Sequence, residues 1–232
     1  MGTKIICVFN KQEFFEKVIV NCKYHKNCEF FGYDNTKENT ALTKHYNYFI
    51  EENIPQDATP ENSDFWCVFM HQDFAFQEDI DLALKNLDKN FIYGPIGIKF
   101  LTPNLCQSKE RFKPTDAICF GKILQMAGSQ FIHYGCEIKE PTIVDTVDCC
   151  CIIMHSSLIR KFNLRFDENL SFHMYAEELC YRARRDYELE TKANQFHCFH
   201  LGAGTTNEEF KNSAQYLKAK FNINKIPSTC DN

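Results

Sequence analysis

The segment from residue 65 to residue 76, FWCVFMHQDFAF, places the strongest constraint on the fold of this chain. Its apolar and aromatic run is interrupted by His71, Gln72 and Asp73. A run of this composition predicts a buried strand, and the polar residues indicate where that strand ends. Because open α/β sheets bind ligands beyond the carboxyl ends of their strands, we expect His71 and Asp73 to lie at a binding site.

Length and charge exclude several classes of protein. A chain of 232 residues with 44% hydrophobic content is sufficient for one domain with a substantial core. The net charge of −5, with lysines scattered among acidic residues, offers no basic stripe for a nucleic acid. No stretch has the roughly 18–20 consecutive apolar residues of a transmembrane helix, and the first ten residues are too short for a signal peptide. We therefore expect a cytoplasmic protein, with peripheral attachment to the inner face of a membrane left open.

The first half of the chain alternates strand and helix patterns. Strands are predicted at residues 4–9, 28–33 and 91–93 and at the run that begins at Phe65, and helices at residues 12–21, 38–53 and 77–87. This order predicts an α/β protein with a mostly parallel, Rossmann-like central sheet flanked by helices.

The second half gives fewer signals. Residues 101–140 have only short apolar runs, so no elements are assigned there. One continuous strand is predicted at residues 146–154, a last strand at 188–196, and helices at 157–162 and 175–185. Asn207 is a predicted N-cap for a final helix that ends near Phe221.

Two polar clusters are candidates for chemistry. His71 and Asp73 are two residues apart, so on an extended backbone both side chains point to the same side and could bind one ion. The simpler alternative is a polar turn after a core strand. Glu177 and Glu178 begin a predicted helix, where the helix dipole would keep a carboxylate ionised and ready to act as a general base. Their alternative role is to stabilise the helix start.

Cysteine and histidine residues suggest a third reading. The chain has thirteen cysteines, an odd number that includes the adjacent Cys149, Cys150 and Cys151, and we expect most of them to be reduced, buried thiols. His197, Cys198 and His200 could bind zinc, but a second pair of ligands at zinc-site spacing is missing from the sequence. A Cys/His metal-binding regulatory protein is therefore the weakest of the functional readings.

These motifs occur in a recognisable order. DN follows the second strand, a Tyr-Asn pair lies on the next helix, and FMHQD, VDCCCIIMHSSLIRKFNLRFDENLSFHMYAEELCYRA and HCFHLG follow. The order resembles family-2-type glycosyltransferases of the GT-A fold, in particular small bacterial glycosyltransferase-like proteins with HQD in place of DxD. The resemblance covers residues 4–204. It implies one GT-A-like domain over residues 1–232, with a nucleotide-binding half at about 1–100, an acceptor-binding half at about 101–206 and a C-terminal helix at about 207–221.

The resemblance also implies roles for individual residues. Asp34 and Asn35 would bind the nucleotide, and Asp73 would act as the DxD-type carboxylate on the donor diphosphate. Asp73, His71 and His200 would bind Mn²⁺ or Mg²⁺, with weak metal dependence or none as an alternative because His71 replaces an aspartate. Asp148, His173 and Tyr175 would line the acceptor or donor pocket. The base would be Glu177 or Glu178, and Glu177 is favoured.

The implied activity is transfer of a sugar from a nucleotide-sugar donor to a glycan or glycolipid acceptor, with inversion, in surface polysaccharide or glycoconjugate synthesis. Ala176 departs from the resemblance, because relatives usually carry Asp at that position. The alternative is a non-catalytic nucleotide- or sugar-binding module that has kept the GT-A shape.

Overall fold

The large sheet has seven strands in the computed structural model, which describes residues 2–56, 64–102, 104–109, 111, 113–202 and 206–230. In spatial order they are β2 (Cys28–Asp34), β1 (Thr3–Phe9), β3 (Trp66–His71), β11 (Cys151–His155), β5 (Ile92–Gly94), β12 (Thr191–Ala193) and β9 (Thr142–Val144). β11 and β9 run against the other five strands. The predicted α/β class with a mostly parallel central sheet is therefore confirmed.

Alternate residues of the central strands point into two separate cores. On β3, Cys67 and Phe69 belong to one core, and Trp66, Val68 and Met70 belong to the other. Because successive side chains of a strand point to opposite faces, a strand buried on both faces must be apolar at every position. This burial explains the uninterrupted apolar run that ends at residue 70.

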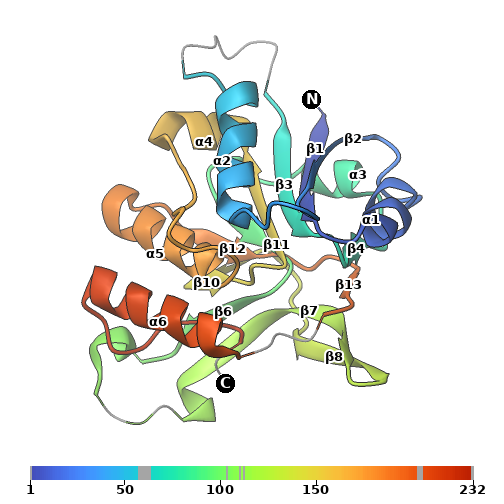
Figure 1. Cartoon of the computed structure of the whole chain (residues 1–232). Helices are drawn as coiled ribbons and strands as arrows, with labels where there is room; N and C mark the ends of the chain where they lie inside the picture. Colours follow the sequence, from blue (N-terminus) through green and yellow to red (C-terminus); the bar gives the residue numbers. More distant parts are fainter. Residues whose placement is uncertain are drawn as a thin grey trace.

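Helices cover both faces of the large sheet (Figure 1). The first core includes residues of α2 (Leu42–Asn53), α4 (Ser156–Phe162), α5 (Tyr175–Tyr187) and α6 (Glu208–Phe221). On the other face lie α3 (Ile80–Leu84) and α1 (Gln12–Phe14), which continues as a π-helical segment, Phe15–Val20. No helix among the described residues is long and apolar enough to cross a membrane.

Capping side chains set several helix boundaries. Asn207 accepts a hydrogen bond from Phe210 N at 2.9 Å, which confirms the predicted N-cap of α6. Asp79 caps α3, so this helix begins later than the predicted residue 77. Asn35 binds both the N–H and the carbonyl of Thr40, and the loop that it closes delays the start of α2 from residue 38 to Leu42.

A second sheet is built largely around β7 and β8, in the region 101–140 to which no elements were assigned from the sequence (Figure 1). Its order is β10 (Thr146–Val147), β6 (Gly97–Phe100), β7 (Ala117–Ala127), β13 (Cys198–His200) and β4 (Phe74–Phe76), and β8 (Gln130–Cys136) pairs with β7. Short 3₁₀ turns, Leu105–Gln107 and Pro114–Asp116, precede β7. Much of β7 and β8 is half-buried or exposed, so neither strand carries the apolar run of a core strand. The missed signal is the Gly128-Ser129 turn, in which Gly128 has φ +63° between strands that pair from Ala127 to Gln130.

The chain leaves one sheet and enters the other within or just after segments that the sequence predicts to be single strands. The predicted strand 146–154 is in fact β10 and β11, which are separated by a turn at residues 148–150. Asp148 forms this turn by accepting a hydrogen bond from Cys150 N at 2.8 Å. The predicted strand 188–196 is strand only at β12, in the large sheet, and β13 of the second sheet begins at Cys198, beyond the predicted end. β3 crosses to β4 through Gln72 and Asp73.

Candidate functional site

A cavity of about 470 Å³ opens between the two sheets at these crossings. Its polar lining includes His71, Asp73, Asp148, His173, His200 and Tyr134. Five of these six side chains were singled out from the sequence, and the structure brings them into one cavity. Gln125, Tyr134, Gly202 and Thr229 also line it and were not predicted.

His71, Asp73 and His200 converge at one end of the cavity. His71 is the last residue of β3 and Asp73 lies in the turn to β4, while His200 ends β13. β13 pairs with β4, with His200 opposite Phe74, and Leu201 N donates to Asp73 O at 2.9 Å. The ligand atoms of the three side chains all lie within 4.8 Å of one another.

The electrostatics of these three residues are linked. Burial disfavours the charged form of Asp73, but the hydrogen bond and charge of His200 outweigh it and keep the pKa of Asp73 below its usual value. Burial also opposes protonation of His200, yet Asp73, whose Oδ1 is 3.4 Å from His200 Nε2, raises its pKa. Burial and the charge of His200 lower the pKa of His71 to about 4, so His71 is neutral at pH 7.

Tyr175 holds His71 from behind the cavity. The Tyr175 hydroxyl donates to the Cys149 carbonyl at 2.6 Å and lies 3.0 Å from His71 Nε2. Since its single proton is directed to Cys149, His71 Nε2–H must donate to it, which leaves the His71 lone pair on Nδ1. Tyr175 is fully buried and does not line the cavity, so it orients His71 rather than facing a substrate as predicted. Phe172 stacks on the His71 ring, with centroids 5.2 Å apart.

The residues fit a divalent cation by their donor chemistry. Two imidazoles and one carboxylate form a three-ligand set that binds divalent transition metals and leaves positions open for a substrate. Gly202 packs against this set, because a Cβ at Gly202 would lie 2.8 Å from Asp73 Oδ2 and 3.1 Å from His200 Nε2. The space beside the three ligands thus depends on a glycine.

The alternative Cys/His metal centre is not assembled. Among the residues that the structure describes, the only group with the geometry to bind a metal is His71, Asp73 and His200, which contains no cysteine. Cys149 lines the cavity, and Cys150 and Cys151 are buried. Burial raises the pKa of the Cys151 thiol, which disfavours the thiolate form that a metal requires.

Asp148 is held in place from two directions. Its Oδ1 accepts the hydrogen bond from Cys150 N, and its Oδ2 accepts one from the Thr229 hydroxyl. Burial alone would raise the pKa of Asp148, but these hydrogen bonds and the charge of His200 lower it, so Asp148 is ionised at neutral pH. Thr229 is 81 residues away along the chain, and the sequence carries no local signal for this contact.

Glu177 and Glu178, the predicted bases, lie outside the cavity. Glu177 is 3% exposed and accepts a hydrogen bond from Ser228 Oγ at 2.7 Å, while its Oε2 has no hydrogen-bond partner among the described residues. Burial raises the pKa of Glu177 to about 7. The effect of burial is therefore larger than that of the helix dipole, which alone would keep this carboxylate ionised.

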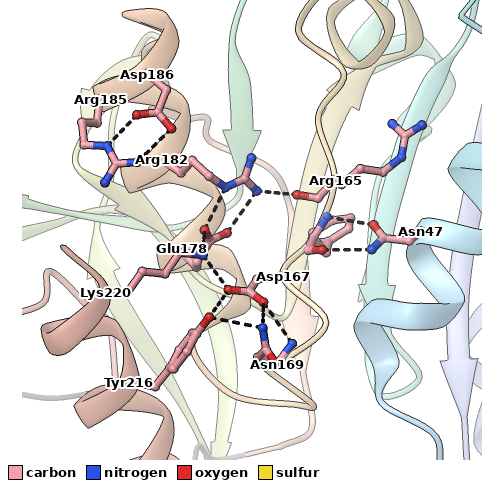
Figure 2. A network of polar contacts seen from close by, with 11 residues as sticks. Asn47, Arg165, Asp167, Asn169, Glu178, Arg182, Arg185, Asp186, Tyr216 and Lys220 are labelled. Carbon is pink, nitrogen blue, oxygen red and sulfur yellow. Dashed lines mark hydrogen bonds and ion pairs between the residues drawn. The ribbon is translucent and has the colours of Figure 1, made fainter.

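Glu178 belongs to a set of ionic contacts that we call the α5–α6 network (Figure 2). The network consists of Asp167, Glu178, Arg182, Tyr216 and Lys220. Glu178 is fully buried and accepts from Arg182 Nε and Lys220 Nζ, both at 2.8 Å. These contacts tie α5 to α6, and they leave Glu178 without access to the cavity.

Asp34 and Asn35 lie apart from the three converging ligands. Asn35 lines a hollow of about 350 Å³ that shares Gln72 and Phe172 with the main cavity. Asp34 is exposed and lines neither space, and its carboxylate accepts a hydrogen bond from Thr36 N at 2.9 Å. Only Asn35 of this pair is therefore placed beside the cavity.

Comparisons with known proteins show similarity of fold. No known protein-family profile matches the chain, and no curated protein does. The crystal structure of S. aureus TarS 1-349 in complex with UDP is similar to this chain, with a TM-score of 0.50 and 12% identity over 97% of this chain and 67% of that one. The crystal structure of S. aureus TarS has a TM-score of 0.48 and 11% identity over 97% of this chain, which spans 40% of the TarS chain. The TarS 1-349 complex with UDP-GlcNAc has a TM-score of 0.49 and 10% identity, with coverages of 97% and 68%.

Proposed function

We propose that this chain is a glycosyltransferase that moves a sugar from a nucleotide-sugar donor to a hydroxyl of a glycan or glycolipid, with inversion, in surface polysaccharide or glycoconjugate synthesis. The observation that carries the proposal is the convergence of His71, Asp73 and His200 at the end of β3, in a cavity between the sheets. Two further facts support it. The motif order resembles family-2-type glycosyltransferases, and the TarS structure of similar fold is a complex with UDP.

The donor side of the site would be the end that carries the three converging ligands. His71, Asp73 and His200 would hold Mn²⁺ or Mg²⁺, and a bound cation supplies positive charge against the leaving diphosphate. The two imidazoles favour Mn²⁺ over Mg²⁺, since Mg²⁺ prefers oxygen ligands. The nucleoside would extend toward the hollow beside Asn35, which adjoins the cavity at Gln72 and Phe172.

The acceptor side would be the end that carries Asp148. An acceptor hydroxyl oxygen would attack the anomeric carbon, the bond to the diphosphate oxygen would break, and the nucleoside diphosphate would leave with the bonding electron pair. The hydroxyl proton needs a carboxylate within hydrogen-bond reach. Glu177 lies outside the cavity with Ser228 on its Oε1, and Glu178 is engaged by Arg182 and Lys220.

A non-catalytic nucleotide-binding module is the second candidate. The observation that favours it is Ala176, which is fully buried at the position where the resemblance leads us to expect a catalytic Asp. Such a module would bind a sugar nucleotide and release neither sugar nor nucleoside diphosphate.

Thermal-shift screening of UDP-, GDP-, CDP- and dTDP-sugars, with and without Mn²⁺, tests the proposal on wild type and on Asp73→Ala. We expect at least one donor to raise the melting temperature of the wild type and not of Asp73→Ala. Asp186→Ala is the matched control, because Asp186 pairs with Arg185 at the protein surface and does not line the cavity. If no donor stabilises the folded wild type, the proposed function is wrong.

A further inference from the structure

Residues 226–230 form a segment that closes one wall of the cavity. Thr229 and Cys230 line the cavity, while Ser228 and Thr229 are only 2% and 7% exposed. Tyr134 OH donates to Thr229 O at 2.8 Å, and Thr146 Oγ1 donates to Pro227 O at 2.5 Å. Hydrogen bonds from β8 and β10 therefore fix the segment over the cavity.

This segment places an alcohol on the Asp148 carboxylate. The Thr229 hydroxyl is a secondary alcohol, as are most hydroxyls of a sugar ring, and it donates to Asp148 Oδ2. The other carboxylate oxygen is fixed by the backbone N–H of Cys150. The contact to Cys150 cannot be exchanged without unfolding the turn, but a side-chain hydroxyl can be replaced by the hydroxyl of a ligand.

Two other carboxylates beside Asp148, Asp73 and Glu177, are already engaged. Among the described residues that line it, Asp73 and Asp148 carry the carboxyl groups, and Asp73 lies against His200. Glu177 lies behind the lining and is held by Ser228 of the same segment. Asp148 is thus the carboxylate at which an incoming hydroxyl would have only Thr229 to displace.

We propose that Asp148 accepts the proton of the acceptor hydroxyl, and that the Thr229 hydroxyl occupies the acceptor's place until an acceptor displaces it. This inference rests on the proposed function. As the acceptor oxygen bonds to the anomeric carbon and the nucleoside diphosphate leaves with the electron pair, the proton passes to Asp148 Oδ2 and then to solvent. With water as acceptor, the products are the free sugar, the nucleoside diphosphate and one proton.

The inference defines the class of acceptor as an alcohol small enough at its reactive end to take the position of a threonine side chain. It also predicts opposite effects for two neighbouring side chains. Loss of Asp148 removes the proton acceptor, whereas loss of the Thr229 hydroxyl frees it. A purely structural hydrogen bond would give instability in both variants and a gain of turnover in neither.

The test follows UDP release from UDP-GlcNAc with water as acceptor, beside calorimetric binding of UDP-GlcNAc to the same proteins. Asp148→Asn should lower UDP release by about 100-fold or more, the usual range for loss of a general base, while the Kd for UDP-GlcNAc changes less than about threefold. Thr229→Val should raise UDP release about fivefold, roughly 1 kcal/mol. Thr229→Ser, which keeps the hydroxyl, should stay within about twofold of wild type, a change of under half a kcal/mol.

The double variant Asp148→Asn/Thr229→Val should release UDP as slowly as Asp148→Asn alone, because the gain acts through Asp148. Asp148→Asn that binds donor and keeps more than about a third of wild-type release (under 1 kcal/mol) overturns the inference. So does a gain from Thr229→Val that survives in the double variant. If Asp148→Asn does not fold, the comparison of Thr229→Val with Thr229→Ser is sufficient. Equal rates of UDP release in these two variants would contradict the inference.

Failure of the proposed function gives a different result. A folded wild type that binds neither UDP-GlcNAc nor a GDP-, CDP- or dTDP-sugar has no donor site, and the inference falls with it; where another donor binds, release is followed from that donor. Binding without UDP release in either wild type or Thr229→Val overturns the inference and supports the nucleotide-binding module.

Discussion

The cavity and the α5–α6 network use the same kinds of residue in opposite ways. In the network each carboxylate forms an ion pair with a basic side chain. Glu178 pairs with Arg182 and Lys220, and Lys220 also contacts Asp167 at 2.6 Å. The cavity is lined by three imidazoles and two carboxylates, of which His71, Asp73 and His200 converge, and Asp73 and His200 form an ion pair at 3.4 Å. Paired buried charges hold helices together, whereas converging polar groups in a cavity need a ligand to complete them. The cavity should therefore respond to mutation in activity, and the network in stability.

Asp73→Asn should break the cavity without harming the fold. We expect turnover to fall by about 1,000-fold, near 4 kcal/mol of transition-state stabilisation. The neutral amide would bind poorly the cation that neutralises the leaving diphosphate, and it would no longer orient the two imidazoles. The melting temperature should change by less than about 3 °C, which corresponds to under 1 kcal/mol for a chain of this size. Steady-state kinetics and calorimetric scanning check both values. A tenfold or smaller loss of turnover would contradict the role of Asp73.

Arg182→Met should break the network without harming the cavity. It keeps an apolar stem but leaves Glu178, which is fully buried, with Lys220 as its remaining ionic partner. Loss of one partner of a buried ion pair should cost about 3 kcal/mol of unfolding free energy. Urea denaturation measures this loss, and turnover per folded molecule should be unchanged. Loss of activity in the folded fraction would show that the two regions are coupled.

The pH dependence of stability should have opposite signs at Glu177 and Asp167. The folded pKa of Glu177, about 7, lies above its ordinary value of 4.5, so its contribution is fully present below pH 4.5 and is lost as the pH rises toward 7. Burial opposes ionisation of Asp167, but the Lys220 hydrogen bond and its other partners lower the pKa of Asp167 to about 2, so its contribution is lost as the pH falls from about 4 to 2.

Denaturation across this pH range tests the two signs with matched variants. Glu177→Gln should remove about 2 kcal/mol of the loss between pH 4.5 and 7, and Asp167→Asn should flatten the loss below pH 4. The wild-type curve also contains the buried His71, whose lowered pKa of about 4 acts with the opposite sign, so the difference between wild type and Glu177→Gln is the decisive quantity. A difference that does not change from pH 4.5 to 7 would contradict the burial of Glu177 without a compensating partner.

Gly202→Ala should change the shape of the cavity without changing its charge. The added Cβ would lie 2.8 Å from Asp73 Oδ2 and would push the carboxylate away from His200, so turnover should fall about tenfold, or 1.4 kcal/mol. Gly2→Ala is the control, because a Cβ there meets nothing within 4 Å. Equal kinetics for the two variants would show that the position of Asp73 tolerates displacement.

Local patterns predicted the parts of the molecule that local sequence determines. The order of β1, β2 and β3, the end of β3 at His71 and the cap at Asn207 all follow from residues within a few positions of one another. The β7–β8 hairpin was missed because its half-exposed side chains carry no apolar run. β13 was missed because it is only three residues long and depends on pairing with β4 and β7.

The candidate site divides in the same way. The approach of His200 to Asp73 depends on strand pairing, and here the resemblance supplied what periodicity could not. Glu177 and Glu178 begin the same helix, yet one contacts Ser228 and the other Arg182, a difference that no helix-start pattern encodes. Thr229 on Asp148 is a long-range contact without a local signature.

Calorimetric titration of UDP into wild type, Asp73→Ala and Asp186→Ala, with and without Mn²⁺, tests the central claim most directly. We expect UDP to bind wild type and Asp186→Ala equally, and Asp73→Ala to lose at least about 30-fold in affinity, near 2 kcal/mol. Mn²⁺ should strengthen binding to wild type and have no effect on Asp73→Ala. A folded Asp73→Ala variant that binds UDP as tightly as the wild type would contradict the assignment of this end of the cavity to the donor diphosphate.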